Sequence, residues 1–104
     1  MLELCAVDDL ENPGSKGFET EKGSIFAVRR DEEVFVYENS CPHLGINLEW
    51  QEDRFLDSEQ RLIQCSTHGA LFLIESGECL AGPCLGDRLT VLPSKVEKGI
   101  VYLL

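Results

Sequence analysis

The sequence has few histidines, few basic residues and no long hydrophobic run. Only 2 of its 104 residues are histidine, and 9 Lys+Arg stand against 19 Asp+Glu, which gives a formal net charge of −10. This charge argues against nucleic-acid binding, because phosphate groups attract basic patches. It also argues against adsorption to anionic membrane surfaces, and no apolar run approaches the length of a transmembrane helix. We therefore expect neither nucleic acid nor a membrane as a partner.

The length and the cysteine count restrict the class of protein. A chain of 104 residues predicts a single domain over residues 1–104. The first four residues, MLEL, do not resemble a signal peptide, and the number of cysteines, 5, is odd. A secreted disulfide scaffold is therefore disfavoured. We expect a monomer in the reducing cytoplasm.

The distribution of β-branched and aromatic residues predicts a mostly β structure. Residues 24–30 and 33–37 are rich in them, and the polar residues around Asp31 predict a hairpin turn between the two strands. Further strands are predicted at residues 61–64, 71–74, 88–93 and 100–104, with glycines between them. Residues 94–99 read as a turn, and residues 49–60 as either a short helix or a loop.

Each histidine lies just downstream of a cysteine, in Cys41-Pro42-His43 and in Cys65-Ser66-Thr67-His68. Two thiolates and two imidazoles suit a structural zinc ion or an iron–sulfur cluster. Zinc sites often take paired cysteines from one segment and paired histidines from another, whereas here each loop supplies one of each. The spacing lets both cysteines bind one iron of a 2Fe–2S cluster and both histidines the other. It therefore favours a dinuclear cluster, with zinc as the alternative.

The motifs CPHLG at 41–45 and CSTHG at 65–69 resemble those of the Rieske 2Fe–2S proteins. The segment GECLAGP at 77–83 resembles the third, proline-containing loop of that family. The resemblance implies an all-β fold, a small antiparallel β-sandwich or partial barrel with a cluster-binding subdomain at about residues 40–84. It also implies that one 2Fe–2S cluster is bound by two loops, with the ligands Cys41, His43, Cys65 and His68.

Departures from the family pattern indicate a subtype. Ile46 and Thr67 stand where respiratory Rieske proteins have two cysteines joined in a disulfide. Ala70 and Phe72 stand where those proteins have a serine and a tyrosine whose hydroxyls donate to sulfur. Because such hydrogen bonds raise the reduction potential, we expect a potential near the lower end of the Rieske range, about −150 mV. These features resemble the soluble ferredoxin components of aromatic-ring dioxygenases.

The resemblance implies a one-electron carrier. The implied donor is an NAD(P)H-dependent flavoprotein reductase, the implied acceptor is an oxygenase, and His43 and His68 would lie at the surface between them. The chain has no further histidine for a mononuclear iron site, so we expect an electron-transfer protein and not an enzyme. Two alternatives are a small Rieske subunit of a larger reductase, such as an assimilatory nitrite reductase, and a zinc-stabilised interaction module. The three other cysteines are expected to be small buried residues and not ligands: Cys5, Cys79 and Cys84.

Overall fold

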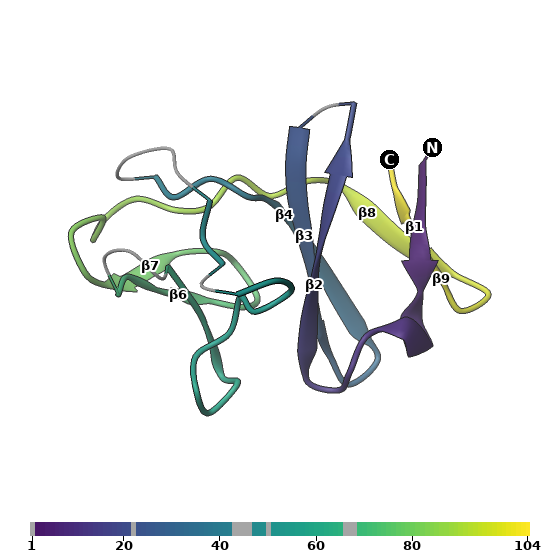
Figure 1. Ribbon diagram of the computed structural model, residues 1–104, viewed down its shortest axis with the longest axis horizontal. Coiled ribbons are helices and arrows are strands. Elements are labelled where there is room, and N and C mark those ends of the chain that lie inside the picture. The colour runs from purple at the N-terminus through teal and green to yellow at the C-terminus, as the bar shows by residue number, and fades with distance from the viewer. Residues whose placement is uncertain (1, 22, 43–46, 50, 66–68) are drawn as a thin grey trace.

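The computed structural model describes residues 2–21, 23–42, 47–49, 51–65 and 69–104 (Figure 1). These residues form three antiparallel sheets of three strands each and one short 3₁₀ helix, η1 (Val7–Asp9). In this part of the chain no helix is long and apolar enough to cross a membrane. The sheets are β1 (Leu2–Ala6), β9 (Ile100–Leu103) and β8 (Ser94–Glu97); β2 (Gly14–Thr20), β3 (Gly23–Arg30) and β4 (Glu33–Glu38); and β5 (Leu62–Gln64), β6 (Leu71–Leu73) and β7 (Cys79–Ala81).

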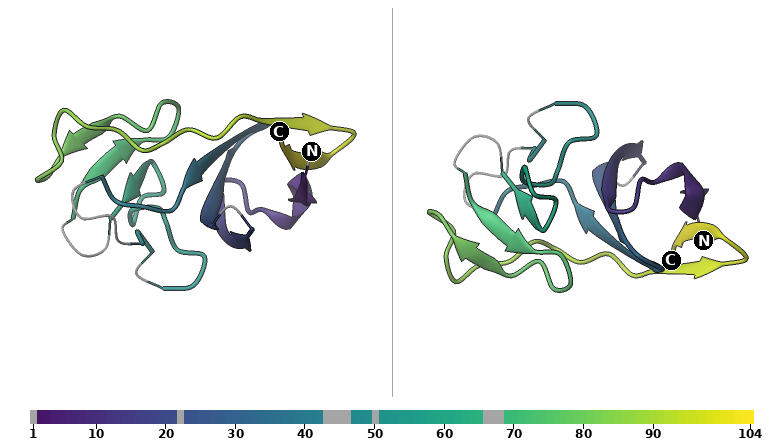
Figure 2. Two further views of the ribbon diagram at one scale, coloured as in Figure 1. Left: turned by 90° about the horizontal axis from the view of Figure 1, so that it is seen from above. Right: turned by 90° about the horizontal axis from the view of Figure 1, so that it is seen from below.

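The central strand β3 is buried on both faces. Side chains of a strand alternate between its faces, so Ile25 and Ala27 enter one hydrophobic cluster while Phe26 and Val28 enter another. The first cluster also contains residues of β1 and β9, and the second contains residues of β5, β6 and β7. The sheet β5–β6–β7 lies at the end of the molecule opposite the termini (Figures 1 and 2). One strand thus supports two layers, which explains its uninterrupted apolar run.

The predicted all-β class and hairpin are confirmed. β3 and β4 pair in register from Ile25↔Glu38 to Arg30↔Glu33, and Asp31 in the turn has a φ of 57°. The strands predicted at 61–64, 71–74 and 100–104 correspond to β5, β6 and β9. Residues 49–60, left open between helix and loop, contain turns and isolated bridges and no helix among those the structure describes.

Two of the predicted elements are wrong. Residues 94–99 were expected as a turn, but β8 occupies Ser94–Glu97 and only Lys98 and Gly99 turn, with φ values of 50° and 77°. β8 is an edge strand with partly exposed side chains, so it shows little apolar pattern. Residues 88–93 form no strand. They make isolated bridges to Glu78 and Tyr37 as they cross from one end of the molecule to the other, so no continuous ladder develops (Figure 2).

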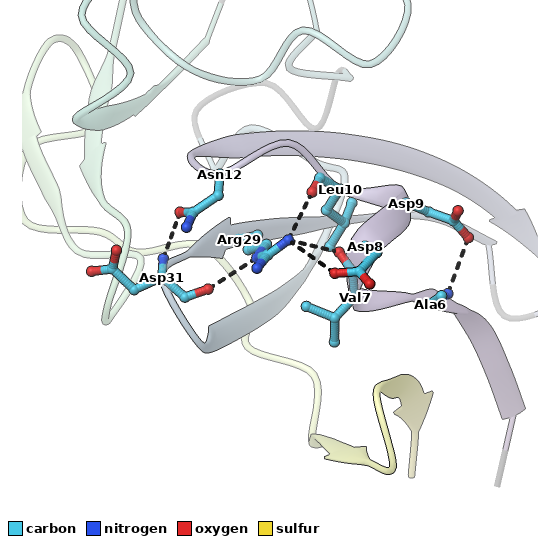
Figure 3. Close-up of polar contacts among 8 residues, drawn as sticks. All are labelled: Ala6, Val7, Asp8, Asp9, Leu10, Asn12, Arg29 and Asp31. Carbon is cyan, nitrogen blue, oxygen red and sulfur yellow. Dashed lines mark hydrogen bonds and ion pairs between the residues drawn. The ribbon is translucent and has the colours of Figure 1, made fainter.

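Arg29 fastens the N-terminal segment to β3 (Figure 3). Its guanidinium donates to the carbonyl oxygens of Val7 at 3.2 Å and Leu10 at 3.1 Å. Val7 is the first residue of η1, and Leu10 follows its last residue. It also donates to the carbonyl oxygen of Asp31 at 2.9 Å, and its side chain is only 15% exposed. These charge-assisted bonds add to the hydrogen bond that the Val7 carbonyl oxygen already accepts from the N–H of Leu10, and they attach this corner to β3.

Asn39 closes the segment that follows β4. Its side chain accepts a hydrogen bond from the N–H of Leu48 at 2.8 Å and donates to the Glu49 carboxylate at 3.1 Å. Its own backbone N–H donates to the Ser24 carbonyl oxygen at 2.9 Å, which anchors it to β3. Asn39 is 4% exposed, so these bonds form away from water. The residues on either side of positions 43–46 are therefore joined through the side chain of Asn39.

We predict that Asn39→Ala lowers the free energy of unfolding by about 1–3 kcal/mol. The substitution leaves the buried N–H of Leu48 without its acceptor, and an unsatisfied buried donor costs about that much. Urea unfolding followed by circular dichroism measures the loss.

The matched control is Asn12→Ala. Asn12 is exposed, and its side chain accepts one bond, from the N–H of Asp31 at 2.7 Å. Water replaces that bond, so the expected loss is less than about 1 kcal/mol. Equal losses for the two variants would contradict the importance of the Asn39 clasp.

Candidate metal centre

The two motif cysteines are completely buried in one hydrophobic cluster. Cys41 follows β4 and Cys65 follows β5, and each is 0% exposed. Both belong to the cluster that also contains Phe72 and Ala70. Neither forms a disulfide. Two segments far apart in the sequence therefore deliver soft sulfur ligands to one shielded region.

The second motif is closed at its base by two backbone hydrogen bonds. The N–H of Cys65 donates to the carbonyl oxygen of Ala70, and the N–H of Gly69 donates to the carbonyl oxygen of Cys65, both at 2.9 Å. Gly69 has a φ of 66°, a conformation that favours glycine. Beyond these bonds β5 and β6 pair directly, with Gln64 opposite Leu71. The residues on either side of positions 66–68 are thus joined by backbone hydrogen bonds.

The residues that flank the first motif are also joined by a hydrogen bond, but here the acceptor is a side chain, that of Asn39. Asn39 precedes Cys41 by two residues and bonds Leu48 on the far side of the motif. Leu48 is fully buried and lies in the same hydrophobic cluster as Cys41. The loop that carries the first motif is therefore fixed by a hydrogen bond and by packing.

The third segment, which contains Gly82, packs against the second loop. Gly82 has a φ of 104°, and a Cβ added to it would lie 2.8 Å from the Cα of Ala70. That distance is too short for any side chain, so the backbone at Gly82 approaches Ala70 because glycine is there. The segment that resembles the third Rieske loop thus lies directly beside the end of the second motif.

Ala70 and Phe72, which stand where the family motif has hydroxyl-bearing residues, carry no hydroxyl group. Both residues are fully buried in the cluster with the two cysteines. Tyr37 belongs to the same cluster, but its hydroxyl donates to the carbonyl oxygen of Ile74 at 2.5 Å. Burial, aided by the charge of Glu75, raises the pKa of Tyr37 to about 12, so its hydroxyl stays protonated. The described surroundings of Cys41 and Cys65 are therefore largely apolar.

The other three cysteines are buried, as expected. Cys5 lies in the separate cluster beneath β1, and burial, followed by the charge of Asp9, raises the pKa of its thiol. Cys79 and Cys84 place their Sγ atoms 2.9 Å apart. Burial, and then the hydrogen bond with Cys79, raises the pKa of Cys84 to about 12. The raised pKa keeps Cys84 a neutral thiol, whereas metal ligation requires a thiolate. Cys84 is therefore poorly suited to bind a metal.

The predicted histidine ligands, His43 and His68, lie outside the described residues, as do Ile46 and Thr67. Among the residues that are described, no group of three His, Cys, Asp or Glu side chains gathers as a metal site. The two buried thiols fit an iron–sulfur cluster, since each lies at the start of a closed loop whose next histidine is two or three residues away. The four-ligand set stays a prediction.

Comparison with known proteins agrees with this arrangement. The chain is 33% identical over 100 residues to apoptosis-inducing factor 3 of Homo sapiens, covering 96% of this chain and 16% of that protein. It is 28% identical over 104 residues to the ferredoxin component of the alkene monooxygenase system of Xanthobacter autotrophicus, covering 98% of this chain and 79% of that one. The chain thus spans about a sixth of the first relative and most of the second.

A solved structure is also similar. A chain in the complex of reduced oxygenase and oxidized ferredoxin of carbazole 1,9a-dioxygenase aligns with a TM-score of 0.81 and 25% identity, covering 99% of this chain and all of that one. Residues 1–95 match the sequence profile of the Rieske [2Fe-2S] domain. The chain therefore belongs to the Rieske [2Fe-2S] domain family, whose cofactor is one 2Fe–2S cluster.

Proposed function

We propose that this chain is a one-electron carrier that accepts electrons from a flavoprotein reductase and delivers them to an oxygenase. The supporting observation is the burial of Cys41 and Cys65 in one core, at the starts of two separately closed loops. In this proposal the two cysteines bind the inner iron, and His43 and His68 bind the outer iron. A cluster bound in this way supplies reversible one-electron transfer. The surrounding residues exclude water and hold the two loops.

A carrier is favoured over a catalytic subunit because both histidines of the chain belong to the motifs. None is left for a mononuclear iron centre, which needs two histidines and a carboxylate. The similarity to the alkene monooxygenase ferredoxin component supports the same role.

We further propose a cytoplasmic monomer with one domain over residues 1–104, whose cluster-binding part covers about 40–84. The radius of gyration, 12.6 Å, matches the value of about 13 Å expected for a compact domain of this length.

The redox partners would dock at the end of the molecule that carries the ligand loops. Leu80 and Leu85, on either side of Gly82, are 45% and 68% exposed. Exposed leucines beside a redox centre supply an apolar contact, while the net charge of −10 steers the protein toward a basic rim on the partner. The termini lie at the opposite end (Figure 1).

We expect Cys41→Ala and Cys65→Ala each to abolish cluster binding, because each removes an inner-iron ligand. Iron and acid-labile sulfide, measured on anaerobically purified protein, should fall from about two of each per chain to near zero. Cys5→Ala is the control, since Cys5 lies in the other hydrophobic cluster and should leave both contents unchanged. Stoichiometric zinc without sulfide in the parent protein would contradict the proposal.

We expect Ala70→Ser to raise the reduction potential by roughly 20–60 mV. A hydroxyl next to the second loop donates more strongly to the reduced, more negative centre, and a gain of about 0.5–1.5 kcal/mol on reduction corresponds to that shift for one electron. Potentiometric titration measures it. Ala27→Ser makes the same change at another fully buried alanine, in the other cluster, and should leave the potential unchanged. A lower potential in the Ala70 variant would contradict the assignment.

We expect Leu85→Asp to slow electron delivery at least several-fold without changing the potential. The substitution puts a charge into the proposed apolar contact, where desolvation opposes docking. Stopped-flow oxidation of the reduced protein by the oxygenase component of an aromatic-ring dioxygenase gives the rate. Leu104→Asp, at a 54% exposed leucine near the opposite end, should have no effect. Equal rates for both variants would show that docking occurs elsewhere.

A further inference from the structure

A second pair of cysteines lies in the core beside the ligand loops. Cys79 begins β7, and Cys84 follows five residues later. Their side chains are buried, and their Sγ atoms are 2.9 Å apart. The thiol of Cys79 donates to the carbonyl oxygen of Ala81 at 3.3 Å, which leaves the thiol of Cys84 to donate to the sulfur of Cys79. The two groups therefore form a short chain of S–H donors.

The backbone of this loop holds the two sulfurs together. The N–H of Cys79 donates to the carbonyl oxygen of Asp87 at 3.0 Å, and the N–H of Asp87 donates to the carbonyl oxygen of Cys84 at 2.8 Å. Asp87 thus connects both cysteines through its own peptide groups. A disulfide bond has an S–S length of about 2.05 Å, so bond formation needs the sulfurs to approach by about 0.9 Å. Rotation about the side-chain bonds supplies a movement of this size.

The loop is also accessible from outside although the sulfurs are covered. Leu80 and Leu85, each next to one of the two cysteines, are 45% and 68% exposed. The residues between the cysteines are exposed as well, at positions 80–83. A local opening of this short loop therefore exposes both thiols without disturbing β3 or the β1–β9–β8 sheet.

We propose that Cys79 and Cys84 are an oxidisable dithiol that closes to a disulfide by exchange with a low-molecular-weight disulfide. In the locally opened loop, where burial no longer opposes ionisation, one cysteine gives its proton to water and attacks the small disulfide as a thiolate, which releases one small thiol. The other cysteine then loses its proton, attacks the mixed disulfide and releases the second small thiol. The two protein thiols lose their two protons and two electrons, and the small disulfide gains both as two thiols. The reaction uses neither Cys41 nor Cys65, and it does not depend on the electron-carrier role.

The pair lies close enough to the ligand loops to affect them. Gly82, between the two cysteines, packs against Ala70, which follows the second ligand motif. Closure of the disulfide fixes the loop that contains Gly82. This places an oxidation-sensitive element next to the second ligand loop.

The test equilibrates the anaerobic holoprotein with buffers of reduced and oxidised glutathione at several ratios. Samples are quenched in acid, alkylated in denaturant and mapped by mass spectrometry, and iron content is measured in parallel. We expect the five alkylatable thiols of the denatured chain to fall to three as the buffer becomes oxidising. The peptide that contains both Cys79 and Cys84 should carry no alkyl group on these two residues and have the mass of an internal disulfide, while iron is retained.

Two variants separate this reaction from others. Cys5→Ser keeps the pair and should still form the crosslink. Cys84→Ser removes one partner, so it should form no crosslink and should instead retain Cys79 as a thiol or as a glutathione adduct. The proposal is overturned if the parent protein keeps all its thiols at every ratio. It is also overturned if a disulfide forms only after iron is lost and joins Cys41 to Cys65.

Discussion

The structure depends on the meeting of two distant cysteine-bearing segments in one buried hydrophobic cluster. Cys41 and Cys65 are separated by 23 intervening residues, yet both are fully excluded from water in the same cluster. The two loops are held by different means, since the side chain of Asn39 spans the first and backbone bonds between Cys65, Gly69 and Ala70 span the second. Burying two thiols in this way is favourable when they bind a metal centre, because the ligated form is neutralised by the iron.

The central strand β3 connects this cluster to the rest of the fold, because its side chains enter both hydrophobic clusters. β3 contributes Phe26 to the cluster of the ligand loops, where its ring stacks on Phe55 with centroids 4.4 Å apart. Its neighbour Ala27 faces the cluster beneath β1 and β9. Gly17 on β2 leaves space for Phe55, whose ring would lie 3.2 Å from an added Cβ. The β5–β6–β7 sheet and the β1–β9–β8 sheet therefore pack on opposite faces of the layer that contains β3.

Local signals in the sequence were sufficient for the family and for the central hairpin. The β-branched and aromatic residues of β3 and β4 and the spacing of Cys41-Pro42-His43 were visible without structure. Strands with few apolar residues were not visible: the first four residues of β2 are all glycine, serine or lysine, and β8 is a polar edge strand. The contacts of Asn39 depend on tertiary packing, so no local pattern predicts them.

The central claim is a di-iron centre with nitrogen ligands on one iron and sulfur ligands on the other. Electron–nuclear double resonance of the dithionite-reduced protein tests it most directly, since it detects nitrogens bound to the paramagnetic centre. The account predicts strong couplings to two inequivalent nitrogens, both lost when the histidines are replaced together. A reduced centre without directly bound nitrogen, or a protein that contains only a diamagnetic ion such as zinc, would contradict it.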